Sequence, residues 1–74
     1  MGVDHIAMGK YLRRVRRSRG MTQKECAEAI HRSPAFYGHI ERGTRRMSLD
    51  TFCELVTALG LSADELLRAG SARR

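Results

Sequence analysis

The sequence lacks several features that define whole classes of protein. Its 74 residues include no tryptophan, one proline and only two cysteines, Cys26 and Cys53. Two cysteines are too few for a disulfide scaffold, so we expect reduced thiols and an intracellular protein. No apolar run approaches the roughly 20 residues that a membrane-spanning helix needs, and residues 1–5 lack the character of a secretory signal. The length is that of one small domain.

Patterns that would support catalysis or bind metal are also missing. The cysteines and histidines form no Cys-x-x-Cys or His-x-x-x-His pair, so we expect neither a metal site nor a cofactor. There is no glycine-rich phosphate loop and no nucleophile elbow, and we expect that the protein is not an enzyme. A redox role for Cys53 stays open, although no basic residue adjoins it to favour the thiolate.

Acidic residues are scarce relative to basic ones, and the excess is local. The chain has 14 Lys and Arg against 8 Asp and Glu, a net charge of +6. Residues 10–19 contain six bases and no acid, while the remaining eight bases balance the eight acids. Such a segment indicates a polyanionic partner, either nucleic acid or an anionic membrane surface. Charge alone does not separate these from a solvated basic face that only aids solubility.

Apolar spacing predicts an all-α protein. Five helices are expected, over residues 6–18, 22–30, 33–42, 48–59 and 62–70, and no segment alternates as a strand does. The apolar positions expected to face inward are Met8, Leu12, Val15, Cys26, Ala27, Tyr37, Ile40, Leu49, Phe52, Leu55, Val56, Leu59, Leu66, Leu67 and Ile30. Residues 1–70 form the predicted domain, a compact five-helix bundle, and 71–74 a frayed basic tail.

Helix boundaries carry clear signals. Residues 22–25 and 62–65 both read as capping boxes, in which a hydroxyl and a glutamate satisfy each other's backbone amides. Ser33 followed by Pro34 is typical of a helix start. The second and third helices are short and joined by two or three residues, which predicts a helix-turn-helix. At this point an incidental helical bundle remains an alternative to DNA binding.

Several motifs together resemble a known family. Residues 9–16 (GKYLRRVR), 20–23 (GMTQ), Ala27, 40–43 (IERG) and 58–67 (ALGLSADELL) match, in order and spacing, the Cro/C1-type (XRE-family) helix-turn-helix domain. The sequence is thus similar to the lambda-repressor-like DNA-binding fold over about residues 8–68. The resemblance implies a five-helix bundle that binds double-stranded operator DNA, usually as a symmetric dimer, and regulates transcription.

The resemblance also assigns roles to single residues. Arg16 and Glu41 match a structural salt bridge between the first and third helices. Residues 33–42 match the recognition helix, which enters the major groove. Phosphate contacts fall on Thr22, Gln23, Ser33, Gly38, Arg42, Thr44, Arg45 and Arg46. Base readout falls on Pro34, Ala35, Phe36 and His39. Tyr37 is expected in the core with its hydroxyl at the edge.

The recognition helix departs from the family pattern at its start. Pro34 and Ala35 carry no side-chain donor or acceptor, so they cannot make the bidentate contacts that read adenine or guanine. Ala35 and Phe36 can still touch a thymine methyl group, and His39 is the one polar reader. Arg45 or Arg46 entering the groove to read guanine is a further alternative to phosphate contact.

We therefore expect a cytoplasmic, operator-binding regulator that associates with the nucleoid when bound to DNA. A homodimer is expected, with Leu61, Leu66 and Leu67 at its interface, because one short helix cannot specify a long site. The weak start of the recognition helix leaves one alternative of another class. This is a protein-interaction module, antitoxin-like or an adaptor, that keeps the fold with weak DNA binding.

Overall fold

The first helix begins and ends close to the residues that the sequence marks. The computed structural model describes residues 2–71. In it α1 spans His5–Ser18, and the Asp4 carboxylate caps it by accepting a hydrogen bond from the Ala7 amide at 3.0 Å. Gly20 then turns the chain at a φ of 67°, a conformation that favours glycine. The helix ends at Ser18, as predicted, and begins one residue before the predicted start at residue 6.

The next two helices form the predicted helix-turn-helix. α2 covers Gln23–Ala29 and α3 covers Pro34–Arg42. The capping box of α2 is complete, since the Thr22 hydroxyl accepts from the Glu25 amide and the Glu25 carboxylate accepts from the Thr22 amide. Ser33 caps α3 in the same way through the Phe36 amide. Local sequence therefore fixes where both helices start.

The last two helices follow the prediction less closely. α4 covers Leu49–Leu59 and α5 covers Ala63–Ser71. The Ser62 hydroxyl accepts from the Glu65 amide, but the Glu65 carboxylate accepts from the Tyr11 hydroxyl at 3.0 Å. The second capping box is thus only half formed, because a tertiary contact has taken its glutamate. Ser71 belongs to α5, and the rest of the predicted tail, 72–74, lies outside the described residues.

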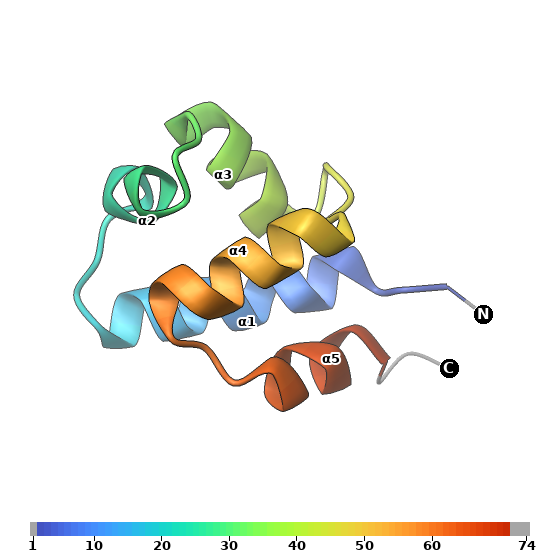
Figure 1. Ribbon diagram of the computed structural model, residues 1–74. Helices are drawn as coiled ribbons and strands as arrows, with labels where there is room; N and C mark the ends of the chain where they lie inside the picture. The colour runs from blue at the N-terminus through green and yellow to red at the C-terminus, as the bar shows by residue number, and fades with distance from the viewer. Residues whose placement is uncertain (1, 72–74) are drawn as a thin grey trace.

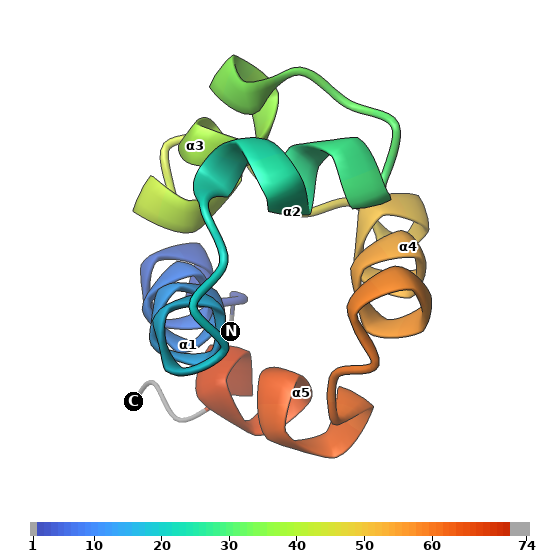
Figure 2. The ribbon, with the colours of Figure 1, turned by 90° about the vertical axis from the view of Figure 1, so that its left-hand side faces the viewer.

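The five helices surround one core, and no strand occurs among residues 2–71. Figure 1 shows α2 and α3 on one side of α1, with α5 on the other. In Figure 2 the helices enclose a common centre, with α1 opposite α4. Eleven buried side chains fill that centre. They are Met8, Tyr11, Leu12, Cys26, Ala27, Ile30, Tyr37, Ile40, Leu55, Leu61 and Leu66.

A glycine sets how closely α1 approaches α3. A Cβ placed on Gly9 would lie 2.1 Å from the backbone oxygen of Glu41. Real carbon atoms do not approach an oxygen so closely, so the two backbones can touch only because residue 9 has no side chain. This contact brings the basic face of α1 next to the C-terminal half of α3, and it positions the site described below.

Three expectations about the core are wrong. Leu49 is 75% exposed, because Thr51 fills the buried position of that turn, and Leu49 lies about 200° from it around the helix. Leu67 is 52% exposed, since its neighbour Leu66 takes the inward position. The Tyr37 hydroxyl is not at the edge of the core. It is buried near Glu41 and Cys26, and it forms no well-aligned hydrogen bond among the described residues.

Candidate nucleic-acid interface

α3 is amphipathic, with one buried and one open side. Tyr37, Ile40 and Glu41 are buried against the rest of the bundle. Pro34, Ala35, His39 and Arg42 are exposed, and Phe36 is half-buried. The side of α3 that the resemblance assigns to DNA is therefore largely open, apart from one residue discussed below.

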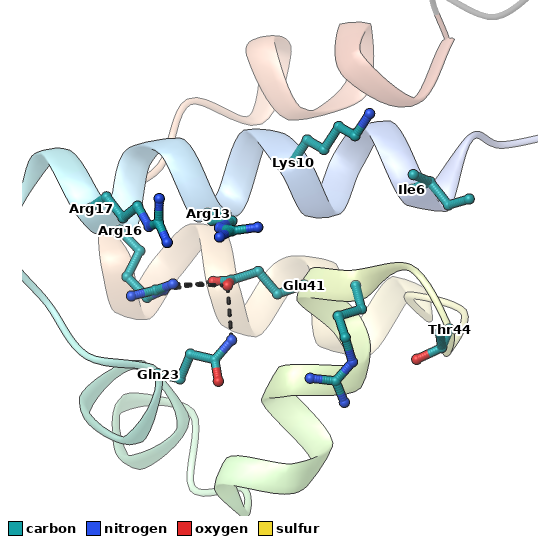
Figure 3. A pocket seen from close by; sticks show the side chains of 9 residues that line it. Ile6, Lys10, Arg13, Arg16, Arg17, Gln23, Glu41 and Thr44 are labelled. Atoms are coloured by element: carbon teal, nitrogen blue, oxygen red, sulfur yellow. Dashed lines mark hydrogen bonds and ion pairs between the residues drawn. The ribbon is translucent and has the colours of Figure 1, made fainter.

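A buried ion pair joins α1 to α3 (Figure 3). The Arg16 Nε lies 2.7 Å from Glu41 Oε2, and its Nη2 lies 3.0 Å from Oε1, so the pair is bidentate. Gln23, the first residue of α2, donates through its side-chain nitrogen to Glu41 Oε1 at 2.9 Å. The Arg16 and Glu41 side chains are 12% and 3% exposed. Three helices therefore meet at one carboxylate.

The surroundings of Glu41 decide its charge. Burial by itself would raise the pKa of this carboxyl group, but hydrogen bonds from Arg16 and Gln23 outweigh that effect and lower the pKa below its usual value. The hydrogen bond to Glu41 raises the pKa of Arg16 despite its burial. Both groups are thus charged at neutral pH, and the pair neutralises itself. Arg16 serves to hold the helices together.

The basic run of α1 divides into structural and open residues. Arg16 pairs with Glu41, and the Arg19 guanidinium donates to the Leu59 backbone oxygen at the end of α4. Arg14 lies over the Tyr11 ring, with its guanidinium carbon 5.4 Å from the ring centroid. The three remaining bases, Lys10, Arg13 and Arg17, line a cleft. Three positive charges of the basic run that have no acidic partner therefore lie at this cleft.

The cleft lies between α1, α2 and α3 and has a volume of about 650 Å³. Figure 3 shows its lining side chains above and below the Arg16–Glu41 pair. Its lining residues are Ile6, Lys10, Arg13, Arg16, Arg17, Gln23, Glu41, Arg42 and Thr44. Glu41 is the only acid among them and is already neutralised, so four cations remain. Such a cleft attracts phosphate groups.

The polar side chains near the end of α3 bind one another. The Nδ1 atom of His39 lies 2.9 Å from the Thr44 hydroxyl and 3.5 Å from an Arg42 guanidinium nitrogen. The Arg42 guanidinium also covers Gly38, where a Cβ would lie 3.1 Å from it. Gly38 is buried. A phosphate could reach Gly38 only if the Arg42 side chain moved, so the phosphate contact of Gly38 stays a prediction.

Two arginines from outside α3 lie over the Phe36 ring. The guanidinium carbon of Arg32 is 4.5 Å from the ring centroid, and that of Arg45 is 4.9 Å from it. The same ring packs partly against the hydrophobic core. Arg32 precedes α3 and Arg45 follows it, so the ring connects the two segments that flank this helix.

Sequence comparison agrees with this geometry. A family model described as a helix-turn-helix domain matches residues 7–69. The chain belongs to the helix-turn-helix domain family. The resemblance to Cro/C1-type domains is thereby confirmed, and so is the lambda-repressor-like, all-α fold.

Two relatives of this helix-turn-helix chain bear the names of uncharacterized HTH-type transcriptional regulators, not of enzymes. It is 37% identical over 60 residues to the HTH-type transcriptional regulator y4dJ of Sinorhizobium fredii, covering 81% of this chain and 78% of the relative. It is 38% identical over 58 residues to the HTH-type regulator YazB of Bacillus subtilis, covering 78% of this chain and 84% of the relative.

Two solved structures are similar to this helix-turn-helix domain. The clp gene regulator ClgR of Corynebacterium glutamicum superposes with a TM-score of 0.84 at 30% identity, over 97% of this chain and 94% of that one. The restriction-modification controller protein C.AhdI of Aeromonas hydrophila gives 0.79 at 33% identity, over 85% and 96%. Both likenesses cover nearly the whole fold.

The structure corrects the expected dimer interface of this helix-turn-helix domain. Leu66 is 0% exposed and Leu61 is 8% exposed, because both complete the small core. Of the three residues expected there, only Leu67 is available on the surface.

The predicted phosphate contacts of Thr22 and Ser33 would have to use the hydroxyl protons. Both hydroxyl oxygens already accept a hydrogen bond from a backbone amide as helix caps, so each hydroxyl would bind a phosphate by donating its proton.

Four basic residues near α3 were not assigned a role from the sequence. Lys10, Arg13 and Arg17 were visible only as part of the charged run, and the helical period alone could have placed them on one side of α1. Arg32 lies in the short segment between α2 and α3, where the sequence carries no binding motif. Its position beside Phe36 depends on how the turn packs, and no sequence motif predicts that packing.

Other kinds of site are not evident in the part of the chain that the structure describes. Within residues 2–71 no group of three or more His, Cys, Asp or Glu side chains could hold a metal ion. None of the described helices has the length and apolar character needed to cross a membrane. Cys26 is buried in the core and Cys53 is exposed.

Proposed function

We propose that this helix-turn-helix regulator binds double-stranded DNA at a specific operator, with α3 in the major groove. The observation that carries the proposal is the cationic cleft beside α3. Lys10, Arg13, Arg17 and Arg42 line it around one neutralised ion pair. Lys and Arg side chains around a groove-sized helix match the phosphate backbone on either side of a major groove.

Within this proposal, positioning and readout fall to different residues. The cleft cations, Gln23, Arg45 and Arg46 contact phosphates, which fixes the helix without reading sequence. His39 is the polar side chain exposed on α3 that can bind a base edge, while Ala35 can contact a thymine methyl group. Few polar readers on a nine-residue helix mean that one half-site carries little information.

That limit favours a homodimer on an inverted repeat. Two copies of α3 about 34–36 Å apart would read half-sites one helical turn from each other. Leu67, exposed on α5, is the part of the expected interface that remains available for a second copy. A protein with this role acts in the cytoplasm, on the nucleoid.

Salt dependence of binding tests the proposal directly. We expect affinity for duplex DNA, measured by fluorescence anisotropy, to fall about a thousandfold or more between 50 and 200 mM salt for a dimer with six or more phosphate contacts. Arg13→Ala and Arg17→Ala should each lower the slope. Arg68→Ala removes the same charge from an exposed position on α5 and is the matched control. Weak, salt-independent binding would instead favour a protein-interaction module.

A further inference from the structure

The ring of Phe36 packs partly against the hydrophobic core and is partly exposed to solvent. Phe36 lies in the first turn of α3, is half-buried and packs against the hydrophobic core. Because its position is fixed by the core, any side chain that stacks on the ring is fixed as well. Arg32 and Arg45 both do so, at 4.5 Å and 4.9 Å from the centroid.

These two arginines have little else to hold them. Arg32 reaches the Glu54 carboxylate only at 3.9 Å, and the two side chains are 39% and 42% exposed, so this ion pair is weak. Arg45 is exposed and forms no ion pair within residues 2–71. The aromatic ring is therefore the contact that they share, and it brings two positive charges together.

Stacking of this kind leaves the charged groups available to a ligand. A guanidinium that lies over an aromatic ring uses its flat face, and its N–H donors stay in the plane of the group. Those donors are the ones that bind phosphate oxygens, often in pairs. Two guanidinium groups on one ring thus form a preorganised cationic pair.

We propose that Phe36 positions Arg32 and Arg45 together beside the first turn of α3 to bind the DNA backbone, and that Phe36 itself does not read a base. The inference rests on the proposed function, since it concerns the same DNA surface. It assigns a phosphate-binding role to Arg32, which precedes the recognition helix, and it changes the role of Phe36 from reader to positioning residue.

Substitution at Phe36 separates these roles. Phe36→Leu keeps an apolar side chain and removes the ring, whereas Phe36→Tyr keeps the ring. We expect the leucine variant to bind every duplex about tenfold more weakly, because two mobile arginines must then be ordered on binding. The tyrosine variant should bind like the parent protein. Relative preference among sequences should be unchanged in both.

A double-mutant cycle tests whether the arginines act through the ring. Arg45→Ala and Arg32→Ala should each weaken binding in the parent protein and weaken it less in the Phe36→Leu background. In NMR spectra of the free protein, ring currents should shift the side-chain protons of both arginines upfield. The shifts should persist in Phe36→Tyr and vanish in Phe36→Leu, which tests the stack even if Phe36→Leu is destabilised.

Four results would overturn the inference. The first is additive losses in the cycle, and the second is unshifted arginine protons in the parent protein. The third is a Phe36→Leu variant that binds as well as the parent, which would mean that Phe36 has no role in binding. A Phe36→Leu variant that changes preference at a single base pair would equally overturn the inference, because Phe36 would then read a base. In each case the parent protein would still bind DNA, so the proposed function would stand. If the parent protein binds no duplex, both proposals fail together.

Discussion

The ion pair between Arg16 and Glu41 makes a strong prediction about stability. Replacing Arg16 by methionine removes two of the three hydrogen bonds to the Glu41 carboxylate and its compensating charge. A buried carboxylate left without its cation costs about 3–5 kcal/mol. A domain of 74 residues has roughly 4–11 kcal/mol of stability, from about 0.05–0.15 kcal/mol per residue. Arg16→Met should therefore remove about half of it.

The double variant Arg16→Met with Glu41→Leu is the informative comparison. It replaces both charges with apolar side chains of similar size, and such replacements are often neutral or stabilising. We expect urea unfolding, followed by circular dichroism, to place the double variant within about 1 kcal/mol of the parent. If the double variant is as unstable as Arg16→Met alone, loss of packing explains the effect and the electrostatic reasoning is refuted.

The pH dependence of stability gives an independent test of this ion pair. The pKa of Glu41 is lowered in the folded protein. The stability that the ionised Glu41 carboxylate contributes is therefore complete at neutral pH. It is lost as the pH falls from about 4.3, the usual pKa of glutamate in an unfolded chain, through the lower pKa of the folded protein. In Arg16→Met the buried carboxyl favours its neutral form, so stability should rise as pH falls towards that range. The double variant should show neither trend from this site.

Three further predictions concern the core. Gly9→Ala should destabilise the fold by several kcal/mol, because a Cβ would lie 2.1 Å from a backbone oxygen of α3, whereas Gly2→Ala, with nothing within 4 Å, should be neutral in the same urea assay. Tyr37→Phe should keep or raise stability by about 1 kcal/mol, since it removes a buried hydroxyl that forms no well-aligned hydrogen bond; a clear loss of stability would contradict this. A thiol reagent should modify Cys53 quickly and Cys26 only after unfolding, because Cys26 is buried and burial raises the pKa of its thiol.

Local signals in the sequence predicted the secondary structure well. Capping residues such as Asp4, Thr22 and Ser33 act through backbone groups three residues away, so their effect can be read without knowing the fold. The Glu65 side chain shows the limit of such signals. It matches a capping motif, yet it binds Tyr11, 54 residues away in sequence, because tertiary packing brought a hydroxyl closer.

The site was harder to predict for the same reason. The resemblance placed Arg16 opposite Glu41, and the structure has this pair. The sequence alone could not show which basic residues of the first helix pair within the protein and which face the cleft. That depends on the positions of α3 and α4, which supply the partners of Arg16 and Arg19. The contacts of Phe36 with Arg32 and Arg45 depend on two loops, whose conformations follow from packing rather than from any local pattern.

Selection from a pool of random duplex DNA tests the central claim most directly. The purified protein would be equilibrated with the pool at physiological salt, and the retained duplexes would be sequenced. The account predicts enrichment of an inverted repeat whose half-sites are about one helical turn apart. Retention without any enriched sequence would contradict it, because backbone contacts would then exist without readout by α3.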